Sequence, residues 1–330
     1  MYDALFHPYE QPTPPASRRN SKVSVIGTGQ VGMAVAYAMV IQNTASQIML
    51  VDANEDKAEG EAMDIQHGLS FVQPMNVSHG TLEDCAGSDI IVITAGVKRR
   101  VGEDRLELVG RNIELFKTLI PQLVKVAPDA IYLIVSNPVD VMTYATLKLS
   151  GLPPSSVIGS GTILDTSRFR ALLSQKLNLA PHNVHAYVLG EHGDSEVPIW
   201  SGVYVASTPL RKHFPDLGEP GSEWEALFDN VRNAAQHVIK RKGATCYAIG
   251  LGVNRLIQGI LQNEQHIFTV SAWIDDLYGL KDVCLSLPSV IGRCGVNRLV
   301  QLSLDESELE KLQYSGRVLR NVIEKLDLPA

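Results

Sequence analysis

The sequence predicts an α/β protein, with a doubly wound parallel sheet in its first half and an α+β arrangement in its second. Between residues 22 and 150, runs rich in Val, Ile and Leu alternate with helical stretches. Strands that are apolar on both faces belong to parallel sheets covered by helices, so this alternation predicts the doubly wound sheet. After residue 151, long helical stretches flank shorter strand-like runs, which predicts the α+β half.

The elements of the first half follow from the spacing of apolar residues. The predicted strands are residues 23–26, 48–51, 89–94 and 131–135. The predicted helices between them are residues 31–41, 55–67 and 106–123. In the last of these helices apolar residues recur at intervals of three and four, which is the spacing of one buried helix face.

The second half has its own pattern and suggests a second domain. Its predicted helices are residues 162–177, 223–242, 245–261 and 307–326, and its predicted strands lie near 184–189, 266–274 and 283–291. A chain of 330 residues is long enough for two domains. We divide it into an arm (1–21), a first domain (22–160) and a second domain (161–330). The proline-rich arm is expected to be flexible, or alternatively to wrap a neighbouring subunit.

Composition excludes several classes of protein. Acidic residues outnumber basic ones by 36 to 29, whereas proteins that bind nucleic acids or anionic membranes usually show the opposite balance. The most apolar long stretch, residues 244–261, contains Asn254, Arg255 and Gln258, which predicts a buried helix and no membrane span. Residues 1–21 lack the apolar segment of a secretory signal, and the four cysteines lack zinc spacing. We expect a cytoplasmic protein without a metal site.

A glycine-rich turn directly follows the first predicted strand. Gly27, Gly29 and Gly32 form the pattern G-x-G-x-x-G, and Asp52 ends the second strand 20 residues after Gly32. In a Rossmann-type domain such glycines permit a tight turn and a close approach of pyrophosphate, while the acid binds the ribose hydroxyls. The carboxylate would repel a 2′-phosphate, so the pattern favours NAD over NADP. The alternative is an ordinary glycine turn with a surface aspartate.

A histidine between two glycines is the first candidate for chemistry. His192 lies in a polar turn, residues 190–195, after an apolar run, and histidine is a suitable general acid or base near neutral pH. Asp165 and Arg168 are three residues apart, so they share one helix face. They would either orient the histidine and bind an anion, or form an ordinary surface pair beside a structural histidine.

Two further segments follow predicted sheet strands. Residues 94–105 form a loop with glycines and four cations near its end, which indicates either a mobile anion-binding lid or a solvated basic loop. Residues 136–140 follow the next strand, where ligands bind in α/β sheets. The bond between Asn137 and Pro138 is a candidate for the cis form.

Together these segments resemble the L-lactate/L-malate dehydrogenase family, over residues 22–325. The resemblance rests on the order and spacing of residues 27–32, 94–112, 136–140, 159–170 and 190–195. It implies a Rossmann-type NAD-binding domain, a C-terminal α+β catalytic domain, and hydride transfer between NADH and a small 2-oxo acid.

The resemblance also implies roles for individual residues. His192 would exchange a proton with the substrate oxygen, and Asp165 would orient it. Arg168 would bind the substrate carboxylate as a two-pronged fork. Arg105 would close with the loop and polarise the carbonyl, and Asn137 would contact the same oxygen and the cofactor.

Substrate choice in this family depends on a loop position six residues before the catalytic loop arginine. Lactate enzymes usually have Gln there and malate enzymes have Arg, and this chain has Arg99. The surrounding segments are nevertheless of the lactate type. We expect oxaloacetate/L-malate first and pyruvate/L-lactate second, with Thr245 as the pocket threonine.

The sequence is also compatible with two functions outside this pair of substrates. One is that of a catalytically silent NAD-binding structural protein, and the second is that of an enzyme for bulkier 2-oxo acids. The resemblance suggests a homotetramer. Arg170 and His185 match positions that bind fructose 1,6-bisphosphate between subunits of allosteric bacterial lactate dehydrogenases, although an ordinary interfacial ion site is the favoured interpretation.

Overall fold

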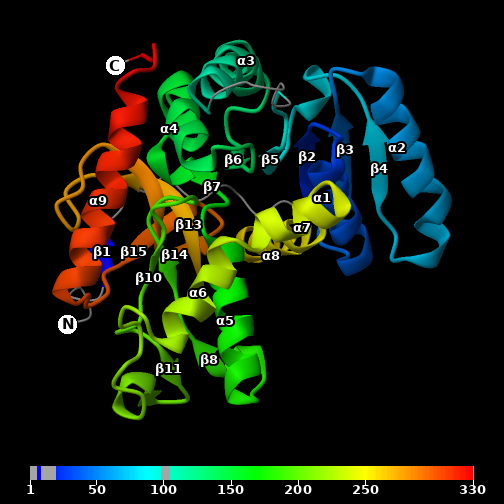
Figure 1. Ribbon diagram of the computed structural model, residues 1–330. Coiled ribbons are helices and arrows are strands. Elements are labelled where there is room, and N and C mark those ends of the chain that lie inside the picture. The colour runs from blue at the N-terminus through cyan, green and yellow to red at the C-terminus, as the bar shows by residue number, and fades with distance from the viewer. Residues whose placement is uncertain (1–5, 9–19, 98–104, 330) are drawn as a thin grey trace.

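A parallel sheet forms the centre of the first half of the chain (Figure 1). The computed structural model describes residues 6–8, 20–97 and 105–329. The parallel strands are β2 (Lys22–Ile26), β3 (Gln47–Val51), β4 (Asn76–His79), β5 (Ile90–Ile93), β6 (Ile131–Ile134) and β7 (Val157–Gly159). Their order in space is β4-β3-β2-β5-β6-β7, the order of doubly wound dinucleotide-binding folds. The predicted fold class is confirmed.

The three long strands of the second half extend the same sheet, and its short strands form two small separate sheets. The strands β13 (His266–Ile274), β14 (Val283–Gly292) and β15 (Gly295–Val300) pair antiparallel, and Ser271 of β13 lies opposite Gly159 of β7. A short strand in the arm, β1 (Phe6–Pro8), pairs antiparallel with β15. The expectation of a flexible arm is therefore wrong for these three residues, because the open edge of β15 offers backbone hydrogen bonds. The division at residue 160 stays a prediction.

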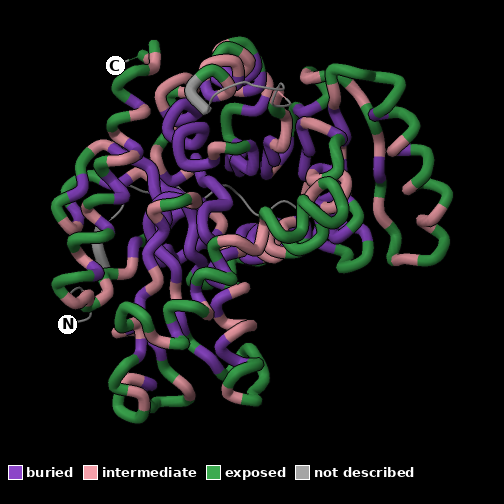
Figure 2. The backbone as a smooth tube through the Cα atoms, in the orientation of Figure 1, coloured by how far each residue is buried: buried purple, intermediate pink, exposed green. Residues whose placement is uncertain are grey.

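Helices cover the sheet and place its strands in the core. They are α1 (Gln30–Gln42), α2 (Glu55–Gly68), α3 (Arg105–Val126), α4 (Val139–Ser150), α5 (Ile163–Leu177), α8 (Tyr247–Leu261) and α9 (Glu306–Ile323). Two further helices, α6 (Glu223–Arg232) and α7 (Ala234–Lys242), lie away from the sheet, and α6 packs on α5. Figure 2 shows the strands buried between helices whose outer faces are exposed. The β-branched and leucine-rich strands thus supply the apolar core that their sequence predicts.

The predicted strand at residues 184–189 is divided in two. β8 (Val184–His185) pairs with β11 (Tyr204–Val205), which also pairs with β12 (Thr208–Pro209), whereas β9 (Val188–Leu189) pairs with β10 (Val197–Pro198). Between β8 and β9, the Ala186 carbonyl accepts a hydrogen bond from Arg170 Nε at 2.8 Å, and the Tyr187 carbonyl accepts one from the Ile199 amide at 2.9 Å. The Arg170 bond takes the Ala186 carbonyl that a continuous strand would have used, whereas the Ile199 bond continues the β9–β10 pairing.

The predicted helix at residues 223–242 is also interrupted. α6 ends at Arg232 and α7 begins at Ala234. The side-chain amide of Asn233 donates to the Asp229 carbonyl at 2.8 Å. Asparagine competes in this way with regular helical hydrogen bonds, so the break falls at this residue.

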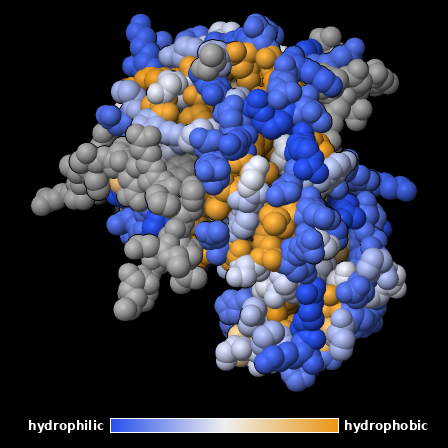
Figure 3. All heavy atoms as spheres, turned by 90° about the vertical axis from the view of Figure 1, so that its left-hand side faces the viewer, coloured by the Kyte–Doolittle hydropathy of each residue, from blue (hydrophilic) through white to orange (hydrophobic). Residues whose placement is uncertain are grey.

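Helix α8 is buried on one face and exposed on the other, so the expectation of a buried helix holds for one face only. Asn254 has no exposed surface and accepts a hydrogen bond from Thr44 at 2.7 Å. On the opposite face the exposed fraction is 73% for Tyr247 and 54% for Leu251. Every helix of the described chain is too short or too polar to cross a membrane. The face seen in Figure 3 is mostly hydrophilic, with separate apolar patches.

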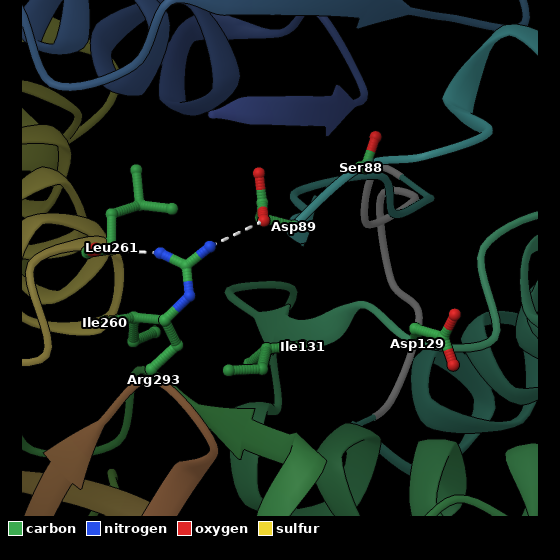
Figure 4. A pocket seen from close by; sticks show the side chains of 7 residues that line it. All are labelled: Ser88, Asp89, Asp129, Ile131, Ile260, Leu261 and Arg293. Atoms are coloured by element: carbon green, nitrogen blue, oxygen red, sulfur yellow. Dashed lines mark hydrogen bonds and ion pairs between the residues drawn. The ribbon is translucent and has the colours of Figure 1, made fainter. Parts of the chain in front are cut away.

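The N-terminal ends of the parallel strands hold a structural tie between the two halves. Arg293, in the turn between β14 and β15, lies 3.2 Å from Asp89 Oδ1 and donates to the Leu261 carbonyl at 2.9 Å (Figure 4). The other oxygen of Asp89 accepts the Lys22 amide at 2.9 Å. The small cavity here, about 30 Å³, lies at the edge of the sheet opposite to the one where ligands bind in such folds.

Candidate active site

The glycine turn between β2 and α1 has the geometry of a phosphate cradle. Gly27 has a φ of +99°, which a residue with a side chain rarely adopts. A Cβ atom on Gly32 would lie 1.9 Å from the Gly27 carbonyl oxygen, so α1 packs directly on the turn. A Cβ atom on Gly29 would meet nothing within 4 Å. Open space at the N-terminus of α1 is what a pyrophosphate needs in order to approach the backbone.

The acid at the end of β3 lies beside this turn. Asp52 Oδ2 accepts hydrogen bonds from the Thr28 amide at 2.7 Å and the Thr28 hydroxyl at 2.9 Å, and Oδ1 accepts the Asn54 amide at 3.0 Å. Burial opposes ionisation of Asp52, but the hydrogen bonds from Asn54 and Thr28 outweigh it and lower the pKa of the carboxyl. Asp52 is thus held as an anion where a dinucleotide's ribose would lie. Thr28, which fixes it, was missed in the sequence.

These features fit NAD. The turn supplies free space over Gly29, and α1 has no acidic residue in its first turn, so no carboxylate of that turn repels a phosphate. The ionised Asp52 suits a ribose with two free hydroxyls and disfavours a 2′-phosphate.

The structure brings His192, Asp165 and Arg168 together. His192 Nδ1 lies 2.6 Å from Asp165 Oδ2, and Arg168 Nη1 lies 2.8 Å from Asp165 Oδ1. Asp165 is buried, whereas 29% of the His192 side chain and 17% of the Arg168 side chain are exposed. One carboxylate therefore joins both cationic groups, each of which retains access to solvent.

Electrostatics favour the protonated form of His192. Burial alone would lower its pKa, but the charge of Asp165 and the hydrogen bond to it, with smaller contributions from Asp140 and Glu196, raise the pKa to about 9. Burial works against ionisation of Asp165 too, and the His192 and Arg168 charges overcome it, so the pKa of Asp165 is lowered. At neutral pH the pair is an imidazolium beside a carboxylate, which can donate a proton.

Two buried carboxyl groups near His192 were not identified from the sequence. The His192 amide donates to Asp140 Oδ2 at 2.7 Å, and burial raises the pKa of Asp140 to about 6. Burial and the Asp165 charge raise the pKa of Glu196 to about 8. Asp140 ends the 136–140 segment and Glu196 follows the 190–195 turn, so both were adjacent to recognised segments. Their burial could not be read from spacing.

Asn137 lies at the C-terminal end of β6, and its bond to Pro138 is cis, as predicted. Its carbonyl accepts a hydrogen bond from Asn112 Nδ2 at 3.2 Å, and Asn112 Oδ1 accepts the Val97 amide at 2.9 Å. Asn112 of α3 therefore ties the described start of the 94–105 loop to the segment after β6.

Three predicted substrate-contacting residues are not brought to His192 by any described contact. Arg99 lies outside the described residues, and Arg105 is described only as the first residue of α3. Thr245 is half-buried in the connection between α7 and α8. The roles expected for these three residues stay predictions.

The two residues predicted to bind an anion between subunits lie in different surroundings. Arg170 stacks on the Tyr187 ring, 4.9 Å from its centroid, and lines a surface cavity of about 470 Å³ between α5, α8 and β13. His185 is exposed on β8 and is not among the residues that line this cavity. In the monomer the structure does not join them into one site.

The fold and the site define an NAD-dependent dehydrogenase. A doubly wound sheet carries the cradle and Asp52, and one buried carboxylate holds both a protonated histidine and an arginine.

Comparison with known proteins identifies the family. The lactate/malate dehydrogenase NAD-binding domain matches residues 21–159, and the alpha/beta C-terminal domain of the same family matches residues 162–327. The chain belongs to the lactate/malate dehydrogenase family. It is therefore an NAD-dependent oxidoreductase that acts on the CH–OH group of small 2-hydroxy acids and on the corresponding 2-oxo acids.

The similar proteins match this chain over almost its whole length. The chain is 52% identical to an L-lactate dehydrogenase of Synechococcus sp. over 92% of its length and 99% of the relative's. It is 48% identical to an L-lactate dehydrogenase of Gloeobacter violaceus over 98% of its length and 99% of the relative's. A solved lactate dehydrogenase from a deep-sea metagenome superposes with a TM-score of 0.89 at 43% identity, covering 93% of this chain and 99% of that one. These similarities favour an enzyme over a silent NAD-binding protein.

Proposed function

We propose that the chain is an L-lactate dehydrogenase, which interconverts pyruvate and L-lactate with NADH and NAD. The contact of one buried carboxylate, Asp165, with both His192 and Arg168 carries the reaction class of this proposal. The names of the similar proteins support pyruvate as the substrate better than oxaloacetate. The preference for oxaloacetate expected from Arg99 has no support among them.

His192 acts as the proton donor in the proposed reaction. Its Nδ1 is engaged by Asp165 at 2.6 Å, which leaves Nε2 to face the oxygen of the 2-oxo group. The imidazolium gives its proton to this oxygen as the carbonyl becomes an alcohol, and takes it back when lactate is oxidised. When bound, the cofactor supplies or accepts the hydride at the adjacent carbon.

Arg168 orients the substrate. One of its nitrogens is fixed on Asp165 at 2.8 Å, so the plane of its guanidinium is set before substrate arrives. Its remaining donors bind the substrate carboxylate as a planar fork. Because Asp165 holds both His192 and Arg168, the spacing of these two side chains is fixed. This spacing matches the distance between the carboxylate and the 2-oxo group of the substrate.

The test is a direct comparison of kcat/KM for pyruvate and oxaloacetate with NADH. We expect pyruvate to be preferred. A preference for oxaloacetate would contradict the substrate assignment and leave the reaction class intact, whereas no NADH oxidation with either acid would contradict both.

Arg99 is the one observation that favours a second candidate, oxaloacetate/L-malate. A closed loop with a buried guanidinium would favour a substrate with a second carboxylate. Arg99→Gln separates the two candidates. In a malate enzyme it lowers kcat/KM for oxaloacetate and raises it for pyruvate, whereas in a lactate enzyme whose Arg99 points to solvent the ratio does not change.

Assembly, location and regulation form a separate part of the proposal. The exposed apolar face of α8 supports a homotetramer, and the four free, buried thiols fit a reducing compartment such as the cytoplasm. Arg170 and His185 would approach their copies from neighbouring subunits if fructose 1,6-bisphosphate regulates the enzyme. Light scattering tests the assembly. A pyruvate saturation curve unmoved by millimolar fructose 1,6-bisphosphate would contradict the regulation.

A further inference from the structure

The turn that carries His192 is held from the C-terminal helix as well as from α4 and α5. Ser315 of α9 has no exposed surface, and its Oγ accepts a hydrogen bond from the Glu191 amide at 2.7 Å. The same Oγ lies 3.1 Å from the hydroxyl of Ser195, at the other end of the turn. One side chain that is 124 residues distant in sequence therefore contacts the turn on both sides of His192.

Ser315, Ser195 and Glu191 form a closed hydrogen-bond circuit in which each hydroxyl proton has a single acceptor. Ser195 Oγ donates to Glu191 Oε2 at 2.6 Å. Since a hydroxyl has a single proton, Ser195 has none left for Ser315, and Ser315 must donate across the 3.1 Å contact. The Ser315 oxygen in turn accepts the Glu191 amide. Ser315 thus acts as donor and acceptor at once, a combination that alanine cannot replace.

The glycines of the turn let the backbone close tightly around this circuit. Gly190 has a φ of +87°, and a Cβ atom there would lie 2.7 Å from Ser315 Oγ. A Cβ atom on Gly193 would lie 2.9 Å from the Glu191 carboxyl group. The amide and carbonyl of Gly190 both pair with Ser286 of β14 at 2.9 Å. The turn is therefore built directly against α9 and β14.

We propose that Ser315 is a positioning residue that fixes the His192 turn for proton transfer. This inference rests on the role proposed for His192. The Glu191 amide anchored by Ser315 and the His192 amide anchored by Asp140 are consecutive in the chain. Together they set the point from which the imidazole reaches Asp165.

Loosening this anchor changes the surroundings of the imidazole in a definite direction. The titratable groups that face His192 are Asp165 of α5, Asp140 of α4 and Glu196, which directly precedes β10. Of these, Asp165 is bonded to the ring itself and contributes most to its raised pKa. If the turn moves away from Asp165, the imidazole loses part of this attraction and the pKa of His192 falls. A general loss of stability would not lower this pKa.

The experiment compares Ser315→Ala with the unmodified full-length enzyme, using NADH and pyruvate. We expect kcat/KM for pyruvate to fall roughly 10- to 100-fold, mostly in kcat, because small misplacements of reacting groups have effects of this size. The alkaline limb of the pH profile moves to lower pH, and NADH affinity does not change. Ser174→Ala is the matched control, since the hydroxyl of this buried helical serine donates within α5, to the Ala171 carbonyl at 2.8 Å.

A second variant protects the test against misfolding. Ser195→Ala breaks the same circuit and leaves the Ser315 contact to Glu191 in place, so we expect a smaller fall in kcat. The double variant should be little worse than Ser315→Ala alone. A folded Ser315→Ala enzyme with unchanged kcat and pH limb would overturn the inference. If Ser315→Ala does not fold, an unchanged Ser195→Ala enzyme overturns it, while a lowered kcat with a shifted limb supports it.

The positioning role of Ser315 and the proposed function can be contradicted independently of each other. Turnover by His192→Asn would contradict the proposed role of the histidine. An inactive His192→Asn enzyme together with a Ser315→Ala enzyme that behaves like the Ser174→Ala control would contradict only the positioning role.

Discussion

The cofactor cradle and the His192 turn are built in opposite ways. The cradle and its acid come from a single continuous stretch, residues 27–52, in which strand, turn, helix and strand follow one another. The His192 turn depends on side chains of α4, α5 and α9, which lie up to 124 residues away in sequence. A local site can be recognised as a motif, whereas an assembled site needs the fold before its contacts exist.

The largest expected effect comes from removing His192, the proposed proton donor. His192→Asn should lower kcat for pyruvate by about a thousandfold or more, consistent with the loss of a general acid. NADH affinity, measured by fluorescence titration, should stay the same because the cradle lies elsewhere. Joint loss of binding and turnover would show that the two regions are not independent.

An intermediate effect is expected in the cradle. Asp52→Asn removes the charge that repels a 2′-phosphate but keeps an oxygen for the Thr28 amide. The ratio of kcat/KM for NADPH to that for NADH should rise about tenfold, which corresponds to about 1.4 kcal/mol. At saturating NADH the kcat for pyruvate should not change. If the ratio is unaffected, Asp52 does not face the ribose.

The smallest kinetic effect is expected at the N-terminal ends of the parallel strands, the edge of the sheet opposite to the cofactor cradle. Arg293→Met breaks the pair with Asp89, which keeps its bond to the Lys22 amide. The free energy of unfolding, from urea titration, should fall by about 1.5–3 kcal/mol, the usual contribution of a hydrogen bond to a charged group. The value of kcat/KM for pyruvate should remain within experimental error. A large kinetic loss in a folded variant would mean that this tie shapes the active site.

The same contrast explains what the sequence could and could not predict. The alternation of strands and helices in the first half, the cradle and the Asp165–Arg168 pair follow from local spacing, and all three are present in the structure. Ser315 lies on the helix predicted at residues 307–326, and its role depends on which turn of the chain α9 contacts. Asp140 and Glu196 were likewise invisible because burial, not residue type, gives them their raised pKa values.

The breaks in predicted elements have a similar origin. The strand at residues 184–189 ends where Arg170 takes the Ala186 carbonyl, a contact from a different helix. The helix at residues 223–242 ends at Asn233, whose side chain competes with the backbone. The second break had a local signal in the asparagine itself, whereas the first had none.

The pH dependence of kcat/KM for pyruvate tests the central claim, that Asp165 keeps His192 protonated for proton donation. With the pKa of His192 raised to about 9, activity should be full below this pH and fall as the pH rises through it, because the imidazolium is lost. In Asp165→Asn the attraction is removed, so the limb should move down toward the ordinary histidine pKa of about 6.5. A limb that stays near the same pH in both enzymes would contradict the account.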